Sequence, residues 1–316
     1  MSATIISLAH RRLVIADSKM CDVLHLAKRA AKTQSPVLLC GESGSGKELI
    51  ARYIHDESSR KQKPFISINC AAVPDGLMES ELFGHERGAF TGAVTQHLGK
   101  FERASGGTLL LDEVSEMSIH LQAKLLRVLQ EGEVDRLGGK ETVSINCRVI
   151  STTNREPKES IARGNFREDL FYRINVIRID CPPLRHREDA IEALAHEFLT
   201  QSSQRQDKII NSFRADAMTQ LKKNLWPGNI RELQNVIERA VLLCDGNRIG
   251  SEHLESWLKE SQIKLEHKPP VRLEDLEKSH ILEVLNQTDG NRTVAADQLG
   301  ISGRTLRNKL KLYQLS

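Results

Sequence analysis

The stretch Val37-Leu-Leu-Cys-Gly-Glu-Ser-Gly-Ser-Gly-Lys47 decides the fold class of this 316-residue chain. A short apolar run, typical of a buried strand, leads into a glycine-rich turn, and the amphipathic segment 48–55 that follows has the spacing of a helix. Glycine lets successive backbone N–H groups point at phosphate oxygens, the start of a helix adds partial positive charge, and Lys47 supplies a cation for the β and γ phosphates. A plain strand-to-helix loop is the alternative, but strand, turn and helix together favour a nucleotide-binding loop. The expected nucleotide contacts are Gly41, Glu42, Ser43, Gly44, Ser45, Gly46, Lys47 and Glu48.

Two carboxylates, Asp112 and Glu113, directly follow the apolar run 108–111. Glu48 stands where the usual phosphate loop has a Ser or Thr ligand for magnesium, so the metal contact has to come from elsewhere. We expect Asp112 to hold Mg²⁺ and Glu113 to polarise the attacking water. An exposed turn with two acids is the alternative. Because a phosphate loop precedes these acids, the sequence favours ATP and Mg²⁺ as cofactors.

Short apolar or β-branched runs alternate with longer helical patterns through the first part of the chain. The runs lie at 37–40, 65–68, 108–111 and 149–153. This alternation predicts an α/β fold with a parallel sheet whose strands are buried on both faces. After Pro182-Pro183 the apolar spacing is helical to about residue 258, which predicts an all-helical second unit. The polar segment 261–272 contains a Pro-Pro pair and predicts a linker, and the last 44 residues predict a small helical domain.

The composition excludes several classes of protein. Lys and Arg number 45 against 42 Asp and Glu, and a formal charge of +3 is too small to hold the whole chain on nucleic acid, so such binding has to be local. With 39% hydrophobic residues and apolar runs of at most about five residues, the chain is neither mostly disordered nor embedded in a membrane. The first residues lack the order of a secretory signal, and six scattered cysteines without CxxC pairs indicate reduced core thiols. We therefore expect a cytoplasmic protein with no membrane partner.

The C-terminal segment carries a local positive charge. Between residues 291 and 316 the sequence has five Lys or Arg and one acid. Two helical patterns separated by Gly300 predict a helix-turn-helix whose second helix enters the major groove of double-stranded DNA, and a small helical bundle with a basic solvated face is the alternative. Gly303 lies at the start of the second helix, where it costs up to about 1 kcal/mol of helix stability. The side chains expected to contact DNA are Arg304, Thr305, Arg307, Asn308 and Lys311.

Several phrases of the sequence resemble one protein family. They are Gly41-Glu-Ser-Gly-Ser-Gly-Lys-Glu48, Asn69-Cys-Ala-Ala72, Glu81-Leu-Phe-Gly-His-Glu86, Gly88-Ala-Phe-Thr-Gly-Ala93, Gly106-Gly-Thr-Leu-Leu-Leu-Asp-Glu113, Phe166-Arg-Glu-Asp-Leu-Phe-Tyr-Arg173 and Trp226-Pro-Gly-Asn-Ile-Arg-Glu-Leu233. Together they resemble the AAA+ ATPase domain of bacterial enhancer-binding proteins that activate sigma-54 RNA polymerase. The C-terminal segment resembles the Fis-like DNA-binding domain that ends these activators. Glu48 is itself usual in this family.

The resemblance implies an AAA+ P-loop parallel sheet with a helical lid subdomain, followed by an all-α helix-turn-helix domain of the Fis-like type. The implied divisions are a short N-terminal tail (1–14), an α/β nucleotide-binding subdomain (15–185), a helical lid (186–260), the linker (261–272) and the helix-turn-helix domain (273–316).

The resemblance also implies roles for three polar residues outside the phosphate loop. Asn69 holds Glu113 in a resting position, and Asn154 senses the γ-phosphate. Both follow predicted strands, at the edge where open α/β sheets place their ligands. Arg231, in the helical unit, couples the position of the lid to the nucleotide state.

Two arginines complete the implied catalytic set. Arg167 and Arg173 reach the nucleotide of a neighbouring subunit, where a guanidinium neutralises transition-state charge. This role requires a ring. The alternative is that both arginines pair with Glu168 and Asp169 on a solvated helix of their own subunit.

The hexapeptide Gly88-Ala89-Phe90-Thr91-Gly92-Ala93 serves no purpose in nucleotide chemistry. Glycines at both ends of a stretch of small residues predict a mobile tip, and Phe90 at such a tip is unburied unless a partner covers it. The alternative is that Phe90 packs into the local core. The hexapeptide is identical to the family loop that grips sigma-54, so the resemblance implies that all six residues form the partner contact, driven by movement linked to hydrolysis.

The resemblance implies a Mg-ATP hydrolase that binds enhancer DNA as a dimer, assembles into a hexameric ring and remodels sigma-54 RNA polymerase from the closed to the open complex. One alternative is a DNA-binding regulator or repressor that uses ATP only for assembly. The other is an AAA+ remodeller of a different protein partner. Intact carboxylates and the Phe90 loop favour the first function.

About 14 residues precede the family resemblance, whereas the receiver or sensor domain of many relatives needs on the order of 100 residues. We therefore expect control by a regulatory protein acting in trans, by the level of synthesis, or not at all; a truncated chain is the alternative. The phrases 111–117 and 136–139 resemble flagellar regulators of the family.

Overall fold

The computed structural model describes residues 4–8, 11–254, 277–278, 280–282, 284–285, 288 and 291–313. Two compact units make up the chain, Met1–Leu258 and Lys259–Ser316, and each is described by itself. The predicted linker 261–272 and much of the predicted helix 273–287 lie outside the described residues.

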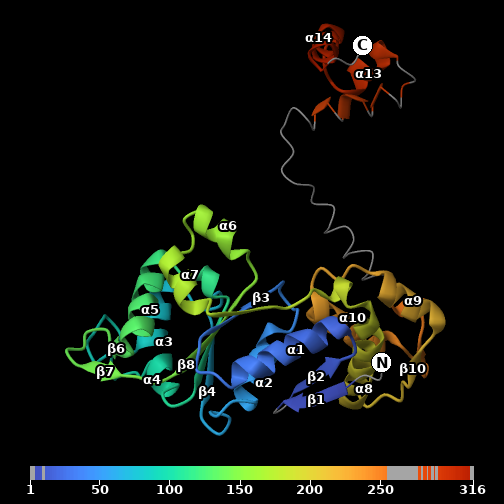
Figure 1. Ribbon diagram of the computed structural model, residues 1–316. Helices are drawn as coiled ribbons and strands as arrows, with labels where there is room; N and C mark the ends of the chain where they lie inside the picture. Colours follow the sequence, from blue (N-terminus) through green and yellow to red (C-terminus); the bar gives the residue numbers. More distant parts are fainter. Residues whose placement is uncertain are drawn as a thin grey trace. The chain divides into compact units, whose positions relative to one another are not determined.

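A five-stranded parallel sheet forms the centre of the first unit (Figure 1), which confirms the predicted α/β fold. Its order is β4 (Phe65–Asn69), β5 (Thr108–Asp112), β8 (Arg148–Thr153), β3 (Val37–Cys40) and β9 (Ile177–Asp180). The sequence analysis did not identify β9, because its Ile-Arg-Ile-Asp alternation lacks the continuous apolar run of a central strand. Every residue of β3 and β8 is buried, but the edge strands β4 and β9 are half exposed, so burial on both faces holds only for the middle of the sheet.

Helices cover both faces of the sheet because alternate strand residues point to opposite sides. On one face Leu39, Leu110 and Ile150 pack against α1 (Ser18–Ala31) and α2 (Lys47–Asp56). On the other face Leu38 and Leu109 join the second core, with four helices: α3 (Asp75–Phe83), α4 (Lys100–Arg103), α5 (Ile119–Glu131) and α7 (Glu168–Ile174). The remaining elements of this part are η1 (Val114–Glu116), the hairpin β6 (Glu133–Asp135) and β7 (Thr142–Ser144), and α6 (Pro157–Ala162).

The segment expected to be a short tail, 1–14, contains most of an antiparallel hairpin of β1 (Thr4–Leu8) and β2 (Arg11–Ile15). Side chains of β2 alternate between two cores. Leu13 and Ile15 pack with α1, whereas Val14 packs with the helical unit that follows the sheet. The tail therefore joins the two parts of the first unit.

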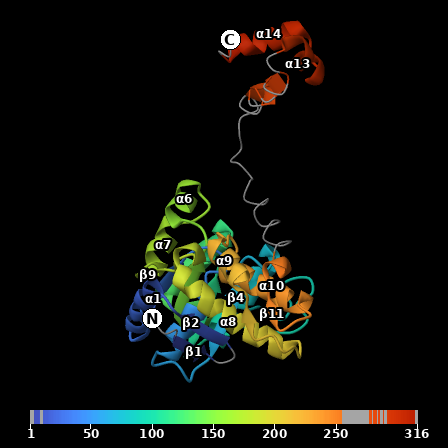
Figure 2. The same cartoon turned by 90° about the vertical axis from the view of Figure 1, so that its right-hand side faces the viewer.

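The helical part after the sheet has its own core. It contains η2 (Leu184–His186), α8 (Glu188–Arg205), α9 (Ala215–Lys223), α10 (Asn229–Leu243) and η3 (Ser251–His253), seen from the side in Figure 2. Trp226 is fully buried there, and its Nε1–H donates to the Leu221 carbonyl oxygen at 2.8 Å. Two short parallel strands, β10 (Ser212–Phe213) and β11 (Arg248–Ile249), depart from the all-helical expectation.

The second unit contains the predicted pair of helices, α13 (Arg292–Gln298) and α14 (Gly303–Leu312). Gly300 turns the chain between them with φ +64°, which favours glycine. Ala295, Leu306 and Leu310 are buried in a core of this unit.

All six cysteines are free thiols, and four of them are buried. None of the helices in the described part of the chain has the length and apolar character needed to span a membrane.

Candidate functional site

A cleft of about 730 Å³ opens between the glycine-rich loop and the helical lid. The loop residues 43–49 line it, Asp112 and Glu113 reach it from the end of β5, and Arg231 reaches it from α10. Gly44 packs so close to the lid that a Cβ atom would lie 2.4 Å from the Gly228 carbonyl oxygen, and Gly46, directly before α2, has φ +100°. The Ser45 hydroxyl is buried and has no hydrogen-bond partner in the described part of the chain. This cradle of glycines and free donors fits a phosphate chain.

Lys47 lies at the floor of the cleft, with 6% of its surface exposed. Its Nζ donates to the carbonyl oxygens of Gly41 at 2.7 Å and Glu42 at 3.0 Å. Burial lowers the pKa of Lys47, while the nearby Asp112 and Glu113 carboxylates act in the opposite direction. The ammonium group therefore sits close to the place where the two acids project.

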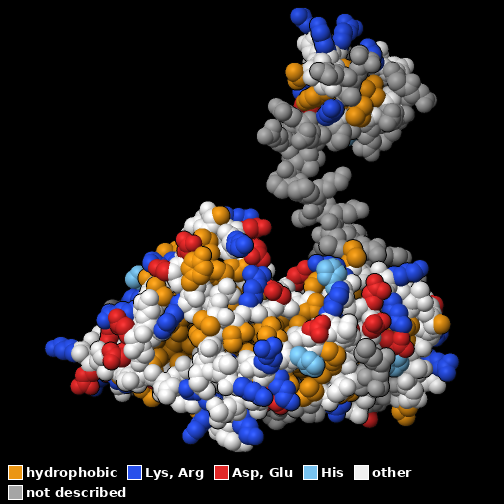
Figure 3. All heavy atoms as spheres, in the orientation of Figure 1, with side chains coloured by type: hydrophobic (Ala, Val, Ile, Leu, Met, Phe, Trp, Pro, Cys, Tyr) orange, Lys and Arg blue, Asp and Glu red, His pale blue; other side chains and the backbone are white. Residues whose placement is uncertain are grey.

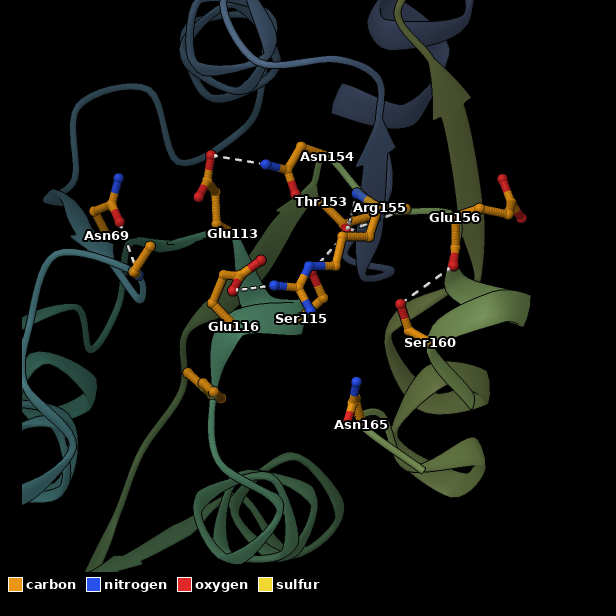
Figure 4. A network of polar contacts seen from close by, with 12 residues as sticks. Asn69, Glu113, Ser115, Glu116, Thr153, Asn154, Arg155, Glu156, Ser160 and Asn165 are labelled. Carbon is orange, nitrogen blue, oxygen red and sulfur yellow. Dashed lines mark hydrogen bonds and ion pairs between the residues drawn. The ribbon is translucent and has the colours of Figure 1, made fainter. Parts of the chain in front are cut away.

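The sheet register brings the expected polar side chains to one edge. Asn69 stands opposite Asp112, and β8 ends next to β3, where Asn154 follows its last residue. The partner of Asn69 differs from the expectation: its Nδ2 donates to Asp112 Oδ2 at 3.1 Å and not to Glu113. The direct register between β4 and β5 explains this choice. Glu113 faces Asn154 instead, whose Nδ2 lies 3.5 Å from Glu113 Oε1 (Figure 4).

Thr152 organises both acids, and the sequence analysis missed it. Its hydroxyl donates to Asp112 Oδ1 at 2.6 Å and accepts the Glu113 backbone N–H at 2.9 Å. Glu113 has φ 58° and ψ 50°, a left-handed conformation that is rare for glutamate and that recurs at functional sites. In the sequence, the one sign of this role is that Thr152 places a hydroxyl near the end of a predicted strand.

The lid holds the phosphate loop through polar contacts. Arg231 Nη1 donates to Ser43 Oγ at 3.0 Å, so this lid residue contacts the phosphate loop directly. Arg185 donates to both Glu42 carboxylate oxygens, at 2.8 and 2.6 Å. Asn229, fully buried with φ 53°, donates to Glu42 Oε2 at 3.1 Å and to the Ser43 carbonyl oxygen at 3.0 Å. Arg185 and Asn229 were not predicted, since their partner is visible only in the folded chain.

Arg167 and Arg173 do not line the cleft of their own subunit. Arg167 donates to both Asp169 oxygens, at 3.0 and 2.7 Å, and Arg173 donates to the Leu129 carbonyl oxygen. Between and beside them Tyr172 and Val176 are exposed, and Figure 3 shows apolar side chains over this region. In the structure neither arginine therefore contacts the nucleotide cleft of its own subunit.

The hexapeptide 88–93 forms a tight loop closed by its ends. The Gly88 N–H donates to the Ala93 carbonyl oxygen at 2.8 Å, and φ is +81° at Gly88 and +109° at Gly92. Phe90 is 42% exposed, and its ring meets the edge of His85 at a centroid distance of 5.0 Å. Phe90 therefore neither packs into the core nor stands wholly free.

The base of this loop is tied to the β6–β7 hairpin. Arg136 donates to Glu86 at 2.6 Å and to both oxygens of Glu102 at 2.9 and 2.6 Å. The Leu137 N–H donates to the Gly84 carbonyl oxygen at 3.0 Å. The base of the loop is thus fixed by contacts with the segment that follows β6.

The second unit presents a basic face on α14. Leu306 and Leu310 point into the core, so the helical period leaves the intervening side chains on the outer side. Arg304, Arg307, Asn308 and Lys311 are exposed and Thr305 is half-buried. Ser302 caps the helix by accepting the Thr305 N–H at 3.1 Å, so Gly303 occupies the first helical turn. Figure 3 shows Lys and Arg side chains together on this unit.

Comparisons with known proteins agree with these features. The sigma-54 interaction domain matches residues 13–180, the AAA+ ATPase lid domain matches residues 185–270, and the bacterial regulatory protein domain of the Fis family matches residues 272–313. The chain is 45% identical to the transcriptional regulatory protein FlbD of Caulobacter vibrioides, over 95% of this chain and 70% of FlbD. It is 49% identical to the regulatory protein AtoC of Escherichia coli, over 93% of this chain and 66% of AtoC. The DNA-binding transcriptional activator HyfR of Escherichia coli is 43% identical, and the chain covers 48% of it.

Among solved structures, NtrX from Brucella abortus in complex with ADP superposes with a TM-score of 0.73 at 35% identity, over 95% of this chain and 68% of NtrX. The complex of NtrX with ATP gives a TM-score of 0.72 at 34% identity. With its phosphate loop, paired acids, lid and basic C-terminal helix, the chain belongs to the bacterial sigma-54-dependent transcriptional activators, a family of AAA+ ATPases that carry a Fis-type DNA-binding domain.

Proposed function

We propose that this chain hydrolyses ATP in the cleft between the phosphate loop and the lid and uses the energy to remodel sigma-54 RNA polymerase. The observation that carries the proposal is the convergence on one cleft of Lys47, at the start of α2, with Asp112 and Glu113, at the end of β5. Lys47 neutralises charge on the β and γ phosphates, and Glu113 polarises the water that attacks the γ-phosphate. Asn154, within reach of Glu113, holds that carboxylate and detects the γ-phosphate.

Asp112 is the residue that would hold Mg²⁺, together with the phosphates of ATP. Both of its oxygens accept hydrogen bonds from the neutral donors Asn69 and Thr152, which orient the carboxylate and leave its charge available. No group of three His, Cys, Asp or Glu side chains in the described ranges forms a metal cage by itself. This fits Mg²⁺, which phosphate-transfer sites bind through one or two carboxylates and substrate oxygens. When bound, the metal supplies charge neutralisation at the transferring phosphoryl group.

Arg167 and Arg173 act on the ATP of a neighbouring subunit in a ring, which we take to be a hexamer built from dimers. Their exclusion from their own cleft and their position beside the exposed Tyr172 and Val176 support this arrangement. A guanidinium that reaches across such an interface neutralises the transition-state charge.

The Phe90 loop is the part that contacts sigma-54. It combines a fixed base at Arg136, glycines at both ends and an aromatic ring with 42% of its surface exposed. An exposed aromatic ring at a protein surface is a feature of binding sites. The six residues 88–93 together form this contact, and hydrolysis alters their position relative to the polymerase.

The basic face of α14 binds double-stranded enhancer DNA. Arg304, Arg307 and Asn308 suit base edges, and Lys311 suits phosphate. Dimers on DNA raise the local concentration of subunits and so favour the ring. The genes served are flagellar in our prediction.

The proposal is tested by capture of sigma-54 in the presence of ADP and aluminium fluoride, which imitate the transition state of hydrolysis. Wild-type protein and a Leu98→Ala control, in which a nearby exposed apolar side chain is removed, should bind sigma-54. Phe90→Ala should not. If wild-type protein forms a ring with the mimic and captures no sigma-54, the remodelling function is wrong and a different partner is favoured.

A further inference from the structure

Thr152 lies where the backbone ladder between β5 and β8 ends. The last pair in this ladder is Leu111 and Ser151, and two residues later Glu113 adopts its left-handed conformation. A backbone N–H that has left the ladder needs another acceptor. The Thr152 hydroxyl provides one, with its Oγ1 at 2.9 Å from the Glu113 nitrogen. A side chain of β8 therefore takes over from the backbone ladder at this position.

The same hydroxyl gives its proton to the other acid. Thr152 Oγ1 donates to Asp112 Oδ1 at 2.6 Å. The Glu113 N–H, the Thr152 O–H and the Asp112 carboxylate thus form one directed chain of hydrogen bonds. The members of such a chain polarise one another, and the ionised acceptor strengthens the bond to it. Thr152 is 0% exposed, so water cannot take the place of its hydroxyl.

Asp112 is held from both sides and still has capacity for a cation. Asn69 donates to Oδ2 at 3.1 Å, and Thr152 donates to Oδ1. A carboxylate has about four lone-pair sites, so these two bonds leave sites open in the cleft that Asp112 lines. Thr152 itself does not line the cleft. Any effect of Thr152 on the chemistry therefore acts through the two acids.

We propose that Thr152 is a positioning residue for ATP hydrolysis. Its hydroxyl fixes the Asp112 carboxylate relative to the Glu113 backbone, so that the acid that holds the metal and the acid that polarises water stay aligned. The inference rests on the proposed function and extends it, because it assigns this alignment to one buried hydroxyl. One partner would be enough to satisfy a buried threonine, whereas Thr152 has two, and they are the two acids of the site.

Amide hydrogen exchange, measured by mass spectrometry without nucleotide or metal, tests the effect on the backbone. Thr152→Val keeps the shape of the side chain and removes the hydroxyl, so the Glu113 N–H loses its acceptor. Exchange in residues 112–116 should become about 2- to 10-fold faster, which corresponds to the loss of one hydrogen bond. Exchange in α1 should not change.

Ser151→Ala is the matched control. Ser151 precedes Thr152 on β8 and is equally buried, but its hydroxyl has no hydrogen-bond partner among the residues that the structure describes. Its loss should leave exchange in residues 112–116 and the rate of hydrolysis at their wild-type values.

Steady-state hydrolysis tests the effect on catalysis. At saturating Mg²⁺, Thr152→Val should lower kcat about 10- to 100-fold, as the loss of a residue that orients a metal ligand does, and leave KM for ATP close to the wild-type value. Thr152→Ser restores a hydroxyl without the methyl group, so it should recover most of kcat and slow the exchange again. If the valine variant does not fold, Thr152→Ala is measured in its place with the same expectations.

Three results would overturn the assignment: wild-type exchange in residues 112–116 without the hydroxyl, an unchanged kcat, or equal losses in Thr152→Ser and Thr152→Val. A hydroxyl that served only the stability of the fold would lower the free energy of unfolding without this change in kcat. Failure of wild-type protein to hydrolyse ATP in any assembly would instead refute the proposed function, and the exchange experiment would still show whether Thr152 holds Glu113.

Discussion

Glu113 owes its place to a strained backbone and to one threonine. Its left-handed conformation costs of order 1–3 kcal/mol, and the hydrogen bond from its N–H to Thr152 Oγ1 helps to hold it. We expect Glu113→Ala to lower the rate of phosphate release about 100- to 10,000-fold and to leave ATP affinity within a few-fold of wild type. Glu116→Gln is the control. Glu116 lies three residues after Glu113 and forms an ion pair with Arg155 (Figure 4). Wild-type phosphate release by Glu113→Ala would remove its assignment as the residue that polarises water.

Glu42 ties the phosphate loop to the lid, and this contact gives stability a pH dependence. The hydrogen bond from Arg185 and, after it, the one from Asn229 hold the pKa of Glu42 below its ordinary value of 4.5, against the opposing effect of burial. A carboxyl whose pKa falls on folding stabilises the folded state above its ordinary pKa. That contribution is lost as the pH falls through the lowered value.

Glu42→Gln should therefore lower the free energy of unfolding at neutral pH by about 0.5–1 kcal/mol, and the difference from wild type should shrink as the pH falls below about 4.5. Urea unfolding of both proteins over a series of pH values measures it. Glu252→Gln, which breaks an exposed pair with Arg214 inside the lid, serves as the control for loss of a charge. A difference between Glu42→Gln and wild type that grows as the pH falls would contradict this prediction.

The loop 88–93 rests against His85, and this contact limits its motion. The imidazole of His85 is fixed by Ser80 Oγ at 2.7 Å from Nδ1 and by a stacked contact with His97 at 5.5 Å. An aromatic pair of this kind contributes about 0.5–1.5 kcal/mol. His85→Ala should therefore speed amide hydrogen exchange in residues 88–93 several-fold and leave α2 unchanged, as measured by mass spectrometry. Unaltered exchange in the loop would show that His85 does not restrain Phe90.

Helix α14 should provide the DNA affinity through its exposed side chains. Lys311→Ala removes one phosphate contact, so we expect weaker binding to all sequences and a decrease of about one unit in the salt slope of log K. Arg307→Ala should in addition reduce discrimination between bases. Fluorescence anisotropy with labelled duplexes at several salt concentrations measures both. Loss of affinity with an unchanged salt slope in Lys311→Ala would place this side chain away from phosphate.

At the level of the whole molecule, Arg167 and Arg173 have a function only in an assembly. Protein that carries Arg167→Ala or Arg173→Ala should bind ATP normally. When this protein is added to wild type in increasing proportion, phosphate release should fall more steeply than the fraction of wild-type subunits. The reason is that each altered subunit removes an arginine from the active site of its neighbour. A strictly proportional decline would mean that the arginines act within their own subunit or not at all.

Sequence motifs predicted most of the fold and most of the nucleotide site, because the strands, the phosphate loop, the paired acids and the basic helix each have a local sequence pattern. Residues that act through distant partners were not predictable: Thr152, Arg185 and Asn229 gain their roles from neighbours far along the chain. The contact between Asn69 and Asp112 was not predicted for a related reason, since strand register and not motif spacing sets Asn69 opposite Asp112. The hairpin of β1 and β2 was missed because its short alternation serves two cores at once.

The coupling of ATP hydrolysis to the Phe90 loop is tested most directly by open-complex formation at a sigma-54 promoter in the presence of ATP, with wild type and Thr91→Ala compared. Thr91 is exposed in the loop and does not line the cleft. We predict that Thr91→Ala hydrolyses ATP at a rate within a few-fold of wild type and forms no open complex. Open complexes at the wild-type level with Thr91→Ala would contradict the proposed role of the loop.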